Sequence, residues 1–286
     1  MAKILYISDL DGTLLTSEQK ISEKSLEIIN RLTALGMIFT FATARSIITA
    51  RKVTEGLVVR NPVIVYNGAF ILDAETGERL VKNVFTPEEA EEIYGILSDF
   101  GISPIVYSII DDKEKFSYIK SKLTKAQKDF NDTRRGDIRH RPVWEDSEML
   151  SGEIFYFACM DEAGSMGEAY DALKERFYCV YGEDIYSGDQ WLEILPRSAT
   201  KANAVIQLKE YLDCDKLVVF GDGKNDILMF QAADECYAVS NADPALKEIA
   251  DGIIGGNNAD SVANFLLENF PGKGFTENSQ KYFQTP

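Results

Sequence analysis

The chain has 286 residues, enough for one large domain or two of ordinary size, and its 45% hydrophobic and 27% charged residues are typical of globular proteins. Its 46 acidic and 30 basic residues give a net charge of −16, which would repel nucleic acids and anionic membranes, so we expect neither as a partner. No apolar run approaches the ~20 residues of a membrane-spanning helix, and Asp9 comes too early for a signal-peptide core, so we predict a cytoplasmic protein.

The cysteines and the single histidine exclude several kinds of site. His140 alone cannot build a metal site from several histidines, and it lies in a charged stretch without a nucleophile-elbow signature. No C-x-x-C spacing occurs, so we predict buried, reduced thiols rather than disulfides or a zinc site. The cysteines are Cys159, Cys179, Cys214 and Cys236.

Short apolar runs alternate with helical patterns at the start of the chain. Continuous apolar runs at 4–7, 37–41 and 63–66 predict strands buried on both faces. A helix is predicted over 22–35, with apolar residues at helical spacing and Gly36 where a C-cap glycine belongs. The order strand, helix, strand, helix, strand predicts a parallel sheet.

The pattern changes between residues 83 and 193. Thr86 and Glu89 form a capping box around Pro87, which predicts a helix that ends near Phe100. Charged helices are predicted over 113–131 and 165–176. Short aromatic-rich strands are predicted at 104–110, 153–160, 177–181 and 191–195. We therefore expect an inserted α+β domain over 83–193.

The alternation of helices and strands resumes at Lys201. Helices are predicted at 201–212 and 260–269, and a further helix is predicted to begin at Pro244 after the N-cap residue Asp243. Strands are predicted at 217–220 and 237–239. The polar tail 271–286 is expected to be loose. The sequence thus predicts an α/β protein with a discontinuous parallel-sheet core, residues 1–82 and 194–286, interrupted by the α+β domain.

Polar side chains follow four predicted strands of the core. Ligands bind beyond the carboxyl ends of parallel strands, so these side chains should meet in one crevice. A single aspartate there is more often a turn or cap residue, but several carboxylates at close range need a cation between them. The cation implied is Mg²⁺, which prefers oxygen ligands. The strand-end residues are Asp9, Asp11, Thr43, Arg45, Asn67, Asp222, Asn225 and Asp226.

These residues resemble the motifs of the haloacid dehalogenase superfamily. Asp9-Leu10-Asp11-Gly12-Thr13 resembles the first motif, Thr43 the second, Lys201 the third and Gly221-Asp222-x-x-Asn225-Asp226 the fourth. Within the superfamily the chain is similar to the Cof-type hydrolases, sugar-phosphatase-like enzymes with a IIB cap. The resemblance covers residues 3–82 and 192–268, and it implies a Rossmann-like core with the insert as a cap that selects the substrate.

The resemblance also implies roles for the acidic residues. Asp9 would be the nucleophile that attacks phosphorus, and Asp11 the acid that protonates the leaving alcohol and then the base that activates water. Asp9, the main-chain carbonyl of Asp11, and Asp222 would hold Mg²⁺. Asn225 and Asp226 would position the site or bind the metal through water.

The remaining motif residues are expected to contact the substrate. Thr43 and Lys201 would hold the transferring phosphoryl oxygens, and Lys201 would also keep Asp9 ionised. Arg45 could contact phosphate or substrate or form a structural salt bridge, and Asn67 and Asn225 belong to the same substrate-binding set. Ala202 replaces the usual glycine after the motif lysine, and residues 197–200 also differ from the common Gly-Val-Ser.

The expected activity is Mg²⁺-dependent hydrolysis of a small phosphomonoester, a sugar phosphate or phosphorylated cofactor, through an aspartyl-phosphate intermediate. Two alternatives are phosphotransfer of the phosphomannomutase type and a non-catalytic phosphometabolite sensor, which would not need the nucleophile. A monomer and a homodimer are both compatible with the sequence.

Two groups of the insert are candidates for substrate recognition or for its core. A basic and aromatic group could hold a sugar or a second phosphate, or form a solvated surface loop: Arg139, His140, Arg141 and Trp144. The aromatic residues at 155–157 are expected in the core of the insert.

Overall fold

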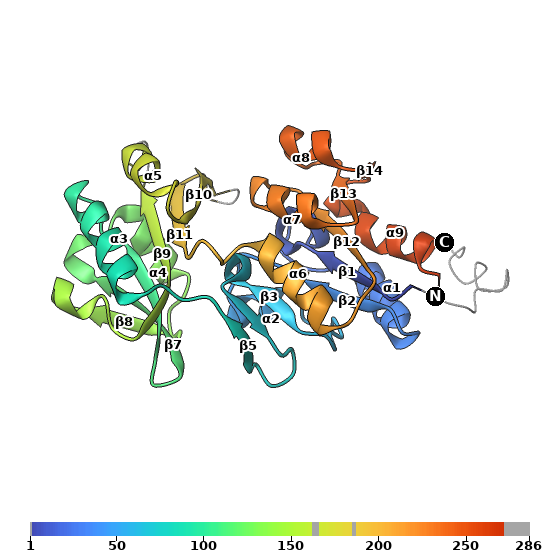
Figure 1. The fold of residues 1–286 in the computed structure, drawn as a ribbon, viewed down its shortest axis with the longest axis horizontal. Coiled ribbons are helices and arrows are strands. Elements are labelled where there is room, and N and C mark those ends of the chain that lie inside the picture. Colours follow the sequence, from blue (N-terminus) through green and yellow to red (C-terminus); the bar gives the residue numbers. More distant parts are fainter. Residues whose placement is uncertain (1, 162–165, 185–186, 272–286) are drawn as a thin grey trace. The chain divides into compact units, whose positions relative to one another are not determined.

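The computed structural model describes residues 2–161, 166–184 and 187–271, and the chain divides into two compact units (Figure 1). The core unit comprises residues 1–80 and 201–286, and the inserted unit comprises residues 81–200. The predicted limits of the insert were 83 and 193. The tail predicted to be loose lies outside the described residues from position 272 onward.

A five-stranded parallel sheet in the order β14-β13-β12-β1-β2 forms the centre of the core unit. Its central strands are continuous apolar runs because both faces are buried, as at Ile7 and Val219, which are fully buried. The strands are β1 (Ile4–Ser8), β2 (Ile38–Phe41), β12 (Lys216–Gly221), β13 (Glu235–Val239) and β14 (Gly252–Ile254). The predicted α/β parallel-sheet core is confirmed.

Helices pack against this sheet in contacting pairs. α1 (Glu23–Ala34) contacts α9 (Ser261–Asn269), and α6 (Lys201–Tyr211) contacts α7 (Ile227–Ala232). The described part of the unit also contains the helices α2 (Ile47–Val53) and α8 (Pro244–Ile249). Each helix of the core unit that was predicted by range is present within a few residues of its predicted ends.

The run at 63–66 is a strand that lies parallel beside the end of β2, as predicted, but its ladder pairing belongs to a second, antiparallel sheet. β3 (Val63–Val65) pairs antiparallel with β4 (Phe70–Leu72), and β4 in turn pairs with β5 (Arg79–Lys82). A parallel bridge between Ile64 of β3 and Ala42, the residue directly after β2, joins the two sheets. The chain reverses directly after β3, because Tyr66 and Asn67 adopt left-handed backbone conformations with φ of +50° and +52°.

The inserted unit contains a six-stranded sheet in the order β10-β11-β9-β6-β7-β8. All neighbouring strands are antiparallel except β7 and β8, which run parallel. The helices α3 and α5 pack on this sheet through a core that includes Leu97, Leu173 and Phe157. The strands are β6 (Ile105–Ile110), β7 (Lys113–Ile119), β8 (His140–Val143), β9 (Glu153–Asp161), β10 (Tyr178–Glu183) and β11 (Gln190–Leu195). The helices are α3 (Pro87–Asp99), α4 (Lys125–Asp132) and α5 (Gly167–Leu173).

The helix predicted over 113–131 is wrong in its first half. Lys113–Ile119 is β7, joined to β6 by a tight turn in which Asp111 and Asp112 have φ of +50° and +61°. Two successive residues with positive φ are typical of a hairpin turn whose twist matches the strands. The helix begins only at Lys125, after the N-cap residue Thr124.

Several local predictions for the inserted unit are confirmed. The capping box of α3 is present, with Thr86 accepting from Glu89 N at 3.2 Å and Glu89 accepting from Thr86 N at 2.9 Å. The aromatic residues at 155–157 are buried.

All four cysteines are free; Cys179 alone is half-buried rather than buried. No helix in the described part of the chain has both the length and the apolar composition needed to cross a membrane.

Candidate active site

The segment after β1 brings the first motif against the end of β12. Gly12 has φ of +73°, and a Cβ at this position would lie 2.2 Å from Asp222 Oδ2, so only glycine fits this approach. Thr13 Oγ1 donates a hydrogen bond of 2.7 Å to Asp222 Oδ1. The first and fourth motifs, 209 positions apart, are therefore joined directly at the carboxyl ends of neighbouring strands.

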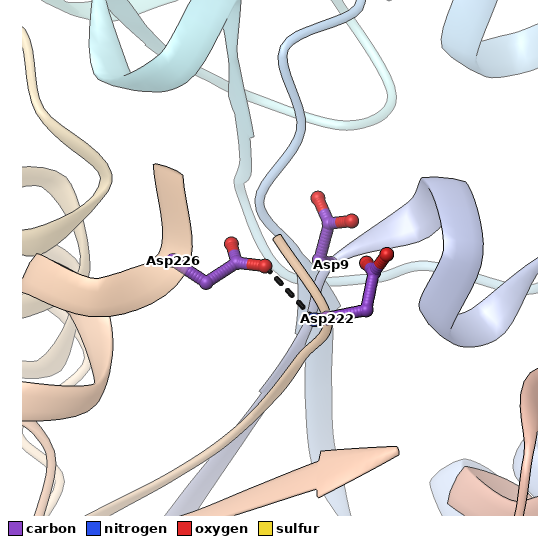
Figure 2. Close-up of side chains that lie close together, drawn as sticks. All are labelled: Asp9, Asp222 and Asp226. Carbon is purple, nitrogen blue, oxygen red and sulfur yellow. Dashed lines mark hydrogen bonds between the residues drawn. The ribbon is translucent and has the colours of Figure 1, made fainter. Parts of the chain in front are cut away.

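Three carboxylates gather at these strand ends (Figure 2). Asp9, Asp222 and Asp226 each offer an oxygen atom, and these atoms lie within 4.8 Å of one another. Burial raises the pKa of Asp9 well above its usual range, and the neighbouring carboxylates raise it further while Lys201 lowers it. Burial and Asp226 raise the pKa of Asp222 to about 7. The site therefore concentrates negative charge where water does not solvate it.

Lys201 supplies the positive charge inside this cluster. It is the first residue of α6 and is fully buried, and its Nζ lies 2.5 Å from Asp9 Oδ1 and 2.7 Å from Asp226 Oδ1. Burial alone would lower the pKa of Lys201, but Asp226 and Asp9 outweigh burial and raise it. Lys201 is therefore charged throughout the physiological pH range and offsets one of the three carboxylates.

Asp226 closes the loop that carries the fourth motif. Its Oδ2 accepts hydrogen bonds from the backbone N–H groups of Asp222 (3.1 Å) and Gly223 (3.0 Å), while its Oδ1 accepts from Lys201. A Cβ at Gly221 would lie 2.7 Å from Asp226 Oδ2, so this strand end also requires glycine. With three donors on its two oxygens, Asp226 fits the positioning role better than that of a metal ligand.

Arg45 forms a two-pronged ion pair with Asp11. Its Nε lies 2.7 Å from Asp11 Oδ2 and its Nη2 lies 2.5 Å from Asp11 Oδ1, and Nη2 also donates to Gln19 Oε1 at 3.0 Å. Of the two roles expected for Arg45, the structure shows the salt bridge. Fork-to-fork pairing of this kind fixes the orientation of both side chains.

Backbone and amide hydrogen bonds connect the remaining strand ends. Asn67 is fully buried, its N–H donates to Thr43 O at 3.0 Å, and its Oδ1 accepts from Asn225 Nδ2 at 3.2 Å. Thr43 Oγ1 accepts from Arg45 N at 3.1 Å. All nine residues predicted for the site thus lie in the core unit. Their contacts form two groups: Asp9, Lys201, Asp222 and Asp226 in one, and Asp11, Thr43, Arg45, Asn67 and Asn225 in the other.

Comparison with known proteins assigns the family. The family model for haloacid dehalogenase-like hydrolases matches residues 6–266, which include the motif residues at all four strand ends. The chain belongs to this hydrolase family. The predicted superfamily, its fold and the prediction of an enzyme are confirmed.

The family members similar to this hydrolase include phosphatases. A 5-amino-6-(5-phospho-D-ribitylamino)uracil phosphatase of Bacillus subtilis is 27% identical, covering 90% of this chain and 95% of its own length. A pyridoxal phosphate phosphatase of Escherichia coli is 24% identical, with coverages of 90% and 95%. A crystal structure of a Thermotoga maritima protein is 27% identical with a TM-score of 0.72, covering 94% of this chain and 98% of that one.

Two asparagines of this hydrolase hold the segment after Asp9 and were not predicted. Asn241 Nδ2 donates to Gly12 O at 2.8 Å, and Asn257 Nδ2 donates to Leu15 O at 2.9 Å. Asn257 N also donates to Asn241 Oδ1 at 3.0 Å, so the two side chains are linked. The only signal in the sequence was the recurrence of asparagine at loop positions, which is as typical of ordinary turns.

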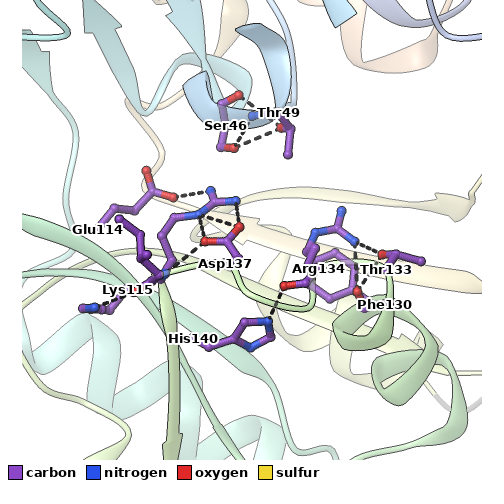
Figure 3. A network of polar contacts seen from close by, with 11 residues as sticks. Ser46, Thr49, Glu114, Lys115, Phe130, Thr133, Arg134, Asp137 and His140 are labelled. Carbon is purple, nitrogen blue, oxygen red and sulfur yellow. Dashed lines mark hydrogen bonds and ion pairs between the residues drawn. The ribbon is translucent and has the colours of Figure 1, made fainter. Parts of the chain in front are cut away.

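The basic group of the insert is structural rather than a solvated loop. Arg139 is buried and forms ion pairs of 2.6 Å with Glu114 and with Asp137 (Figure 3). Arg141 donates to Ser117 Oγ at 3.0 Å and thereby ties β8 to β7. His140 forms hydrogen bonds with Tyr118 and with the carbonyl of Arg134. Of these four residues, only Trp144, with 83% of its surface exposed, is solvated as expected of a loop residue.

Replacing Arg139 is therefore expected to act on stability rather than on substrate affinity. Arg139→Leu would leave the nearly buried Glu114 and Asp137 carboxylates without their cation, and we expect a loss of ~3 kcal/mol in the free energy of unfolding, measured by denaturant titration. Arg135→Leu is the control, because Arg135 is 80% exposed beside Asp132. Equal effects of the two substitutions would contradict a structural role for the buried pairs.

Proposed function

We propose that this hydrolase is a Mg²⁺-dependent phosphatase that cleaves a small phosphomonoester through an aspartyl-phosphate intermediate. The observation that carries the proposal is the buried contact between Lys201 and Asp9 among three carboxylates at the ends of β1 and β12. A carboxylate held beside a fixed cation suits attack on a phosphoryl group. The named activities of the relatives are consistent with this chemistry.

The residues present fit a magnesium ion. Asp9 and Asp222 carry closely spaced carboxylate oxygens, and burial raises the pKa of both carboxyl groups. A single lysine, Lys201, offsets only part of the combined negative charge of Asp9, Asp222 and Asp226. Asp9, Asp222 and the main-chain carbonyl of Asp11 would hold Mg²⁺, which prefers such oxygen ligands and retains waters. When bound, the ion would supply positive charge beside the phosphoryl oxygens.

In the first step, a carboxylate oxygen of Asp9 forms a bond to phosphorus as the bond from phosphorus to the alcohol oxygen breaks. Asp11 donates a proton to that oxygen. Because both carboxylate oxygens of Asp11 accept hydrogen bonds from Arg45, proton donation requires Asp11 to leave this pair. Lys201 and Thr43 hold the phosphoryl oxygens. Thr43 Oγ1 already accepts from Arg45 N, so its hydroxyl proton is available for donation.

In the second step, Asp11 accepts a proton from water as the water oxygen attacks phosphorus and the bond to Asp9 breaks. Inorganic phosphate leaves, and Asp9 and Asp11 return to their starting roles. Lys201 keeps Asp9 in place during both steps, because its second contact, to Asp226, anchors it in the core.

The direct test is phosphate release from a panel of phosphorylated metabolites, with Mg²⁺ or with a chelator. The panel includes pyridoxal 5′-phosphate, 5-amino-6-(5-phospho-D-ribitylamino)uracil, glucose 6-phosphate and glycerol 2-phosphate, the first two because relatives are named for them. We expect release from at least one compound with Mg²⁺ and none with the chelator. Transfer between sugars without release of phosphate would favour a phosphotransferase, and no turnover of any compound would contradict the proposal.

Stability should depend on pH and on Mg²⁺ together. Since the pKa of Asp222 is raised from 3.8 to about 7, the folded metal-free protein binds a proton that the unfolded chain releases. The free energy of unfolding of the metal-free protein should therefore fall as pH rises from about 4 through 7. Mg²⁺ competes with this proton, so we expect it to raise the melting temperature more at pH 8 than at pH 6.

Thermal unfolding at the two pH values, with Mg²⁺ or with a chelator, checks this expectation. Asp222→Asn serves as the control, because it removes the titrating group and a metal ligand while preserving shape. It should lose most of the stabilisation by Mg²⁺ and the part of the pH dependence that comes from Asp222, whereas the part that comes from the raised pKa of Asp9 should remain. An equal shift at pH 6 and pH 8 in the unsubstituted protein would contradict the assignment.

A further inference from the structure

Two further strands of the parallel sheet, β13 and β14, are followed by polar residues. Both strands run parallel to β12 and β1, so the segments after them begin at the edge of the sheet where Asp9 and Asp222 lie. The segment after β13 contains Asn241 and Asp243, and the segment after β14 contains Asn257. None of these three residues belongs to the four motifs.

The segment after β13 contacts the loops of both the first and the fourth motif. Asn241 Nδ2 donates a hydrogen bond of 2.8 Å to Gly12 O, in the first motif. Two residues later, Asp243 N–H donates a hydrogen bond of 2.8 Å to Asp222 O, in the fourth motif. Thr13, next to Gly12, also donates to Asp222 Oδ1 at 2.7 Å. The two motif loops are therefore bonded to each other and to one shared support.

The Gly12 carbonyl is the part of the first motif that most needs such a support. Peptide units are planar, so the direction of the Asp11 carbonyl relative to the next peptide unit is set by φ and ψ of Gly12. These angles are +73° and −5°, and glycine is the residue whose backbone angles are least restricted. A hydrogen bond to Gly12 O fixes the peptide unit between Gly12 and Thr13, and thereby limits rotation of the Asp11 carbonyl.

Asn257 in turn fixes the orientation of Asn241. Its backbone N–H donates to Asn241 Oδ1 at 3.0 Å, so both ends of the Asn241 carboxamide are bonded. The Asn257 side chain donates to Leu15 O at 2.9 Å, farther along the same segment. Only a carboxamide of this length donates and accepts in this way, and alanine could do neither. Because Asn241 is exposed, loss of its hydrogen bonds should cost little stability.

We propose that Asn241 is a positioning residue for the magnesium site, which holds Gly12 and thereby orients the main-chain carbonyl of Asp11 as a metal ligand. The inference rests on the proposed function, in which this carbonyl, Asp9 and Asp222 would hold Mg²⁺. Replacing a group that orients metal ligands typically costs ~10- to 100-fold in metal affinity. Both bonds of the Asn241 side chain are to backbone atoms, so its loss should weaken Mg²⁺ binding and leave the reacting carboxyl groups in place.

The test is the Mg²⁺ dissociation constant of the substrate-free protein at pH 8, obtained from the melting temperature as a function of Mg²⁺ concentration. Asn241→Ala removes the bond to Gly12 and should raise this constant ~10-fold or more. Asn257→Ala keeps the backbone bond to Asn241 and loses only the bond to Leu15, so its effect should be smaller. The melting temperature without Mg²⁺ should change little in either variant.

Asn258→Ala is the matched control. Asn258 also forms two hydrogen bonds with the N-terminal segment, because its Oδ1 accepts from Ser17 N at 2.9 Å and its Nδ2 donates to Ser17 Oγ at 2.9 Å. Ser17 lies well beyond Gly12, so Asn258→Ala should change the Mg²⁺ dissociation constant less than ~2-fold. General loosening of the segment predicts similar effects of the alanine variants, whereas positioning predicts an effect that decreases from Asn241 through Asn257 to Asn258.

Phosphate release provides a second measurement. In Asn241→Ala, the Mg²⁺ concentration for half-maximal release should rise by the same factor as the dissociation constant. KM for the phosphorylated substrate at saturating Mg²⁺ should change less than ~2-fold, and kcat should be largely restored. A merely structural role predicts instead a lower melting temperature without Mg²⁺ and a loss of kcat that added Mg²⁺ does not restore.

The outcomes separate this inference from the proposed function. Equal dissociation constants for Asn241→Ala and Asn258→Ala, in a protein that releases phosphate, would overturn the positioning role and leave the phosphatase function intact. Weaker Mg²⁺ binding by Asn241→Ala than by Asn258→Ala, in a protein that releases no phosphate from any compound, would support the positioning role and contradict the phosphatase function. A melting temperature of the unsubstituted protein that does not respond to Mg²⁺ would overturn both.

Discussion

Asp9→Asn is expected to reduce turnover by ~10,000-fold or more, because a neutral carboxamide cannot attack phosphorus. Asparagine has nearly the same shape as aspartate, so the residue can remain beside Lys201 in the packed site. The substitution also removes a buried negative charge next to Asp222 and Asp226, so the protein should fold. The measurement is steady-state phosphate release together with the melting temperature, which distinguishes lost chemistry from lost structure.

Asp11→Asn provides the matched comparison two residues away. It keeps the nucleophile but removes the group that exchanges protons, which typically costs ~100- to 10,000-fold. With an aryl phosphate, whose leaving group needs little acid assistance, the first step should proceed while hydrolysis of the intermediate slows. Intact-protein mass after an acid quench should then show one added phosphoryl group, absent in Asp9→Asn. Wild-type turnover by Asp9→Asn would contradict the covalent mechanism.

The core and its site could be predicted because their signals are local or depend only on topology. The apolar run at 4–7 and the capping box at Thr86 each specify one element from its own residues. Once parallel strands are predicted, the residues after them are known to meet at one edge of the sheet. The contact of Lys201 with Asp9, separated by 192 positions, does not follow from this rule, because Lys201 begins α6 and does not follow a strand of the parallel sheet. It was expected from the resemblance to the superfamily's motifs.

The errors occurred where tertiary contacts override local pattern. Lys113–Ile119 is rich in charge, which suggested a helix face, but pairing with β6 and the turn at Asp111 make it a strand. Arg139 resembled a surface cation, yet Glu114 and Asp137 bury and neutralise it. No sequence pattern shows that one arginine lies between two carboxylates from separate segments.

Lys201→Met should impair both stability and activity, and the companion variant Lys209→Met separates this effect from a general effect on α6. Methionine preserves most of the length of the side chain but removes its charge in both variants. Lys209 also pairs with an aspartate, Asp234, at 2.8 Å, but both side chains are partly exposed. Such pairs contribute little, so Lys209→Met should change the free energy of unfolding by less than ~1 kcal/mol.

For Lys201→Met, we expect a loss of ~3–5 kcal/mol, because Asp9 and Asp226 are left as buried carboxylates without their cation. The loss should be greater at pH 8 than at pH 5, since burial raises the pKa of Asp9 and protonation of Asp9 at low pH relieves its repulsion with Asp226. Mg²⁺ should restore part of the stability through Asp9 and Asp222, whereas kcat should stay ~100- to 1,000-fold below wild type without the phosphoryl donor. Denaturant titrations at both pH values and phosphate-release assays check these expectations. If Lys201→Met is no less stable than Lys209→Met, or retains full activity, Lys201 neither compensates the acidic cluster nor holds the phosphoryl group.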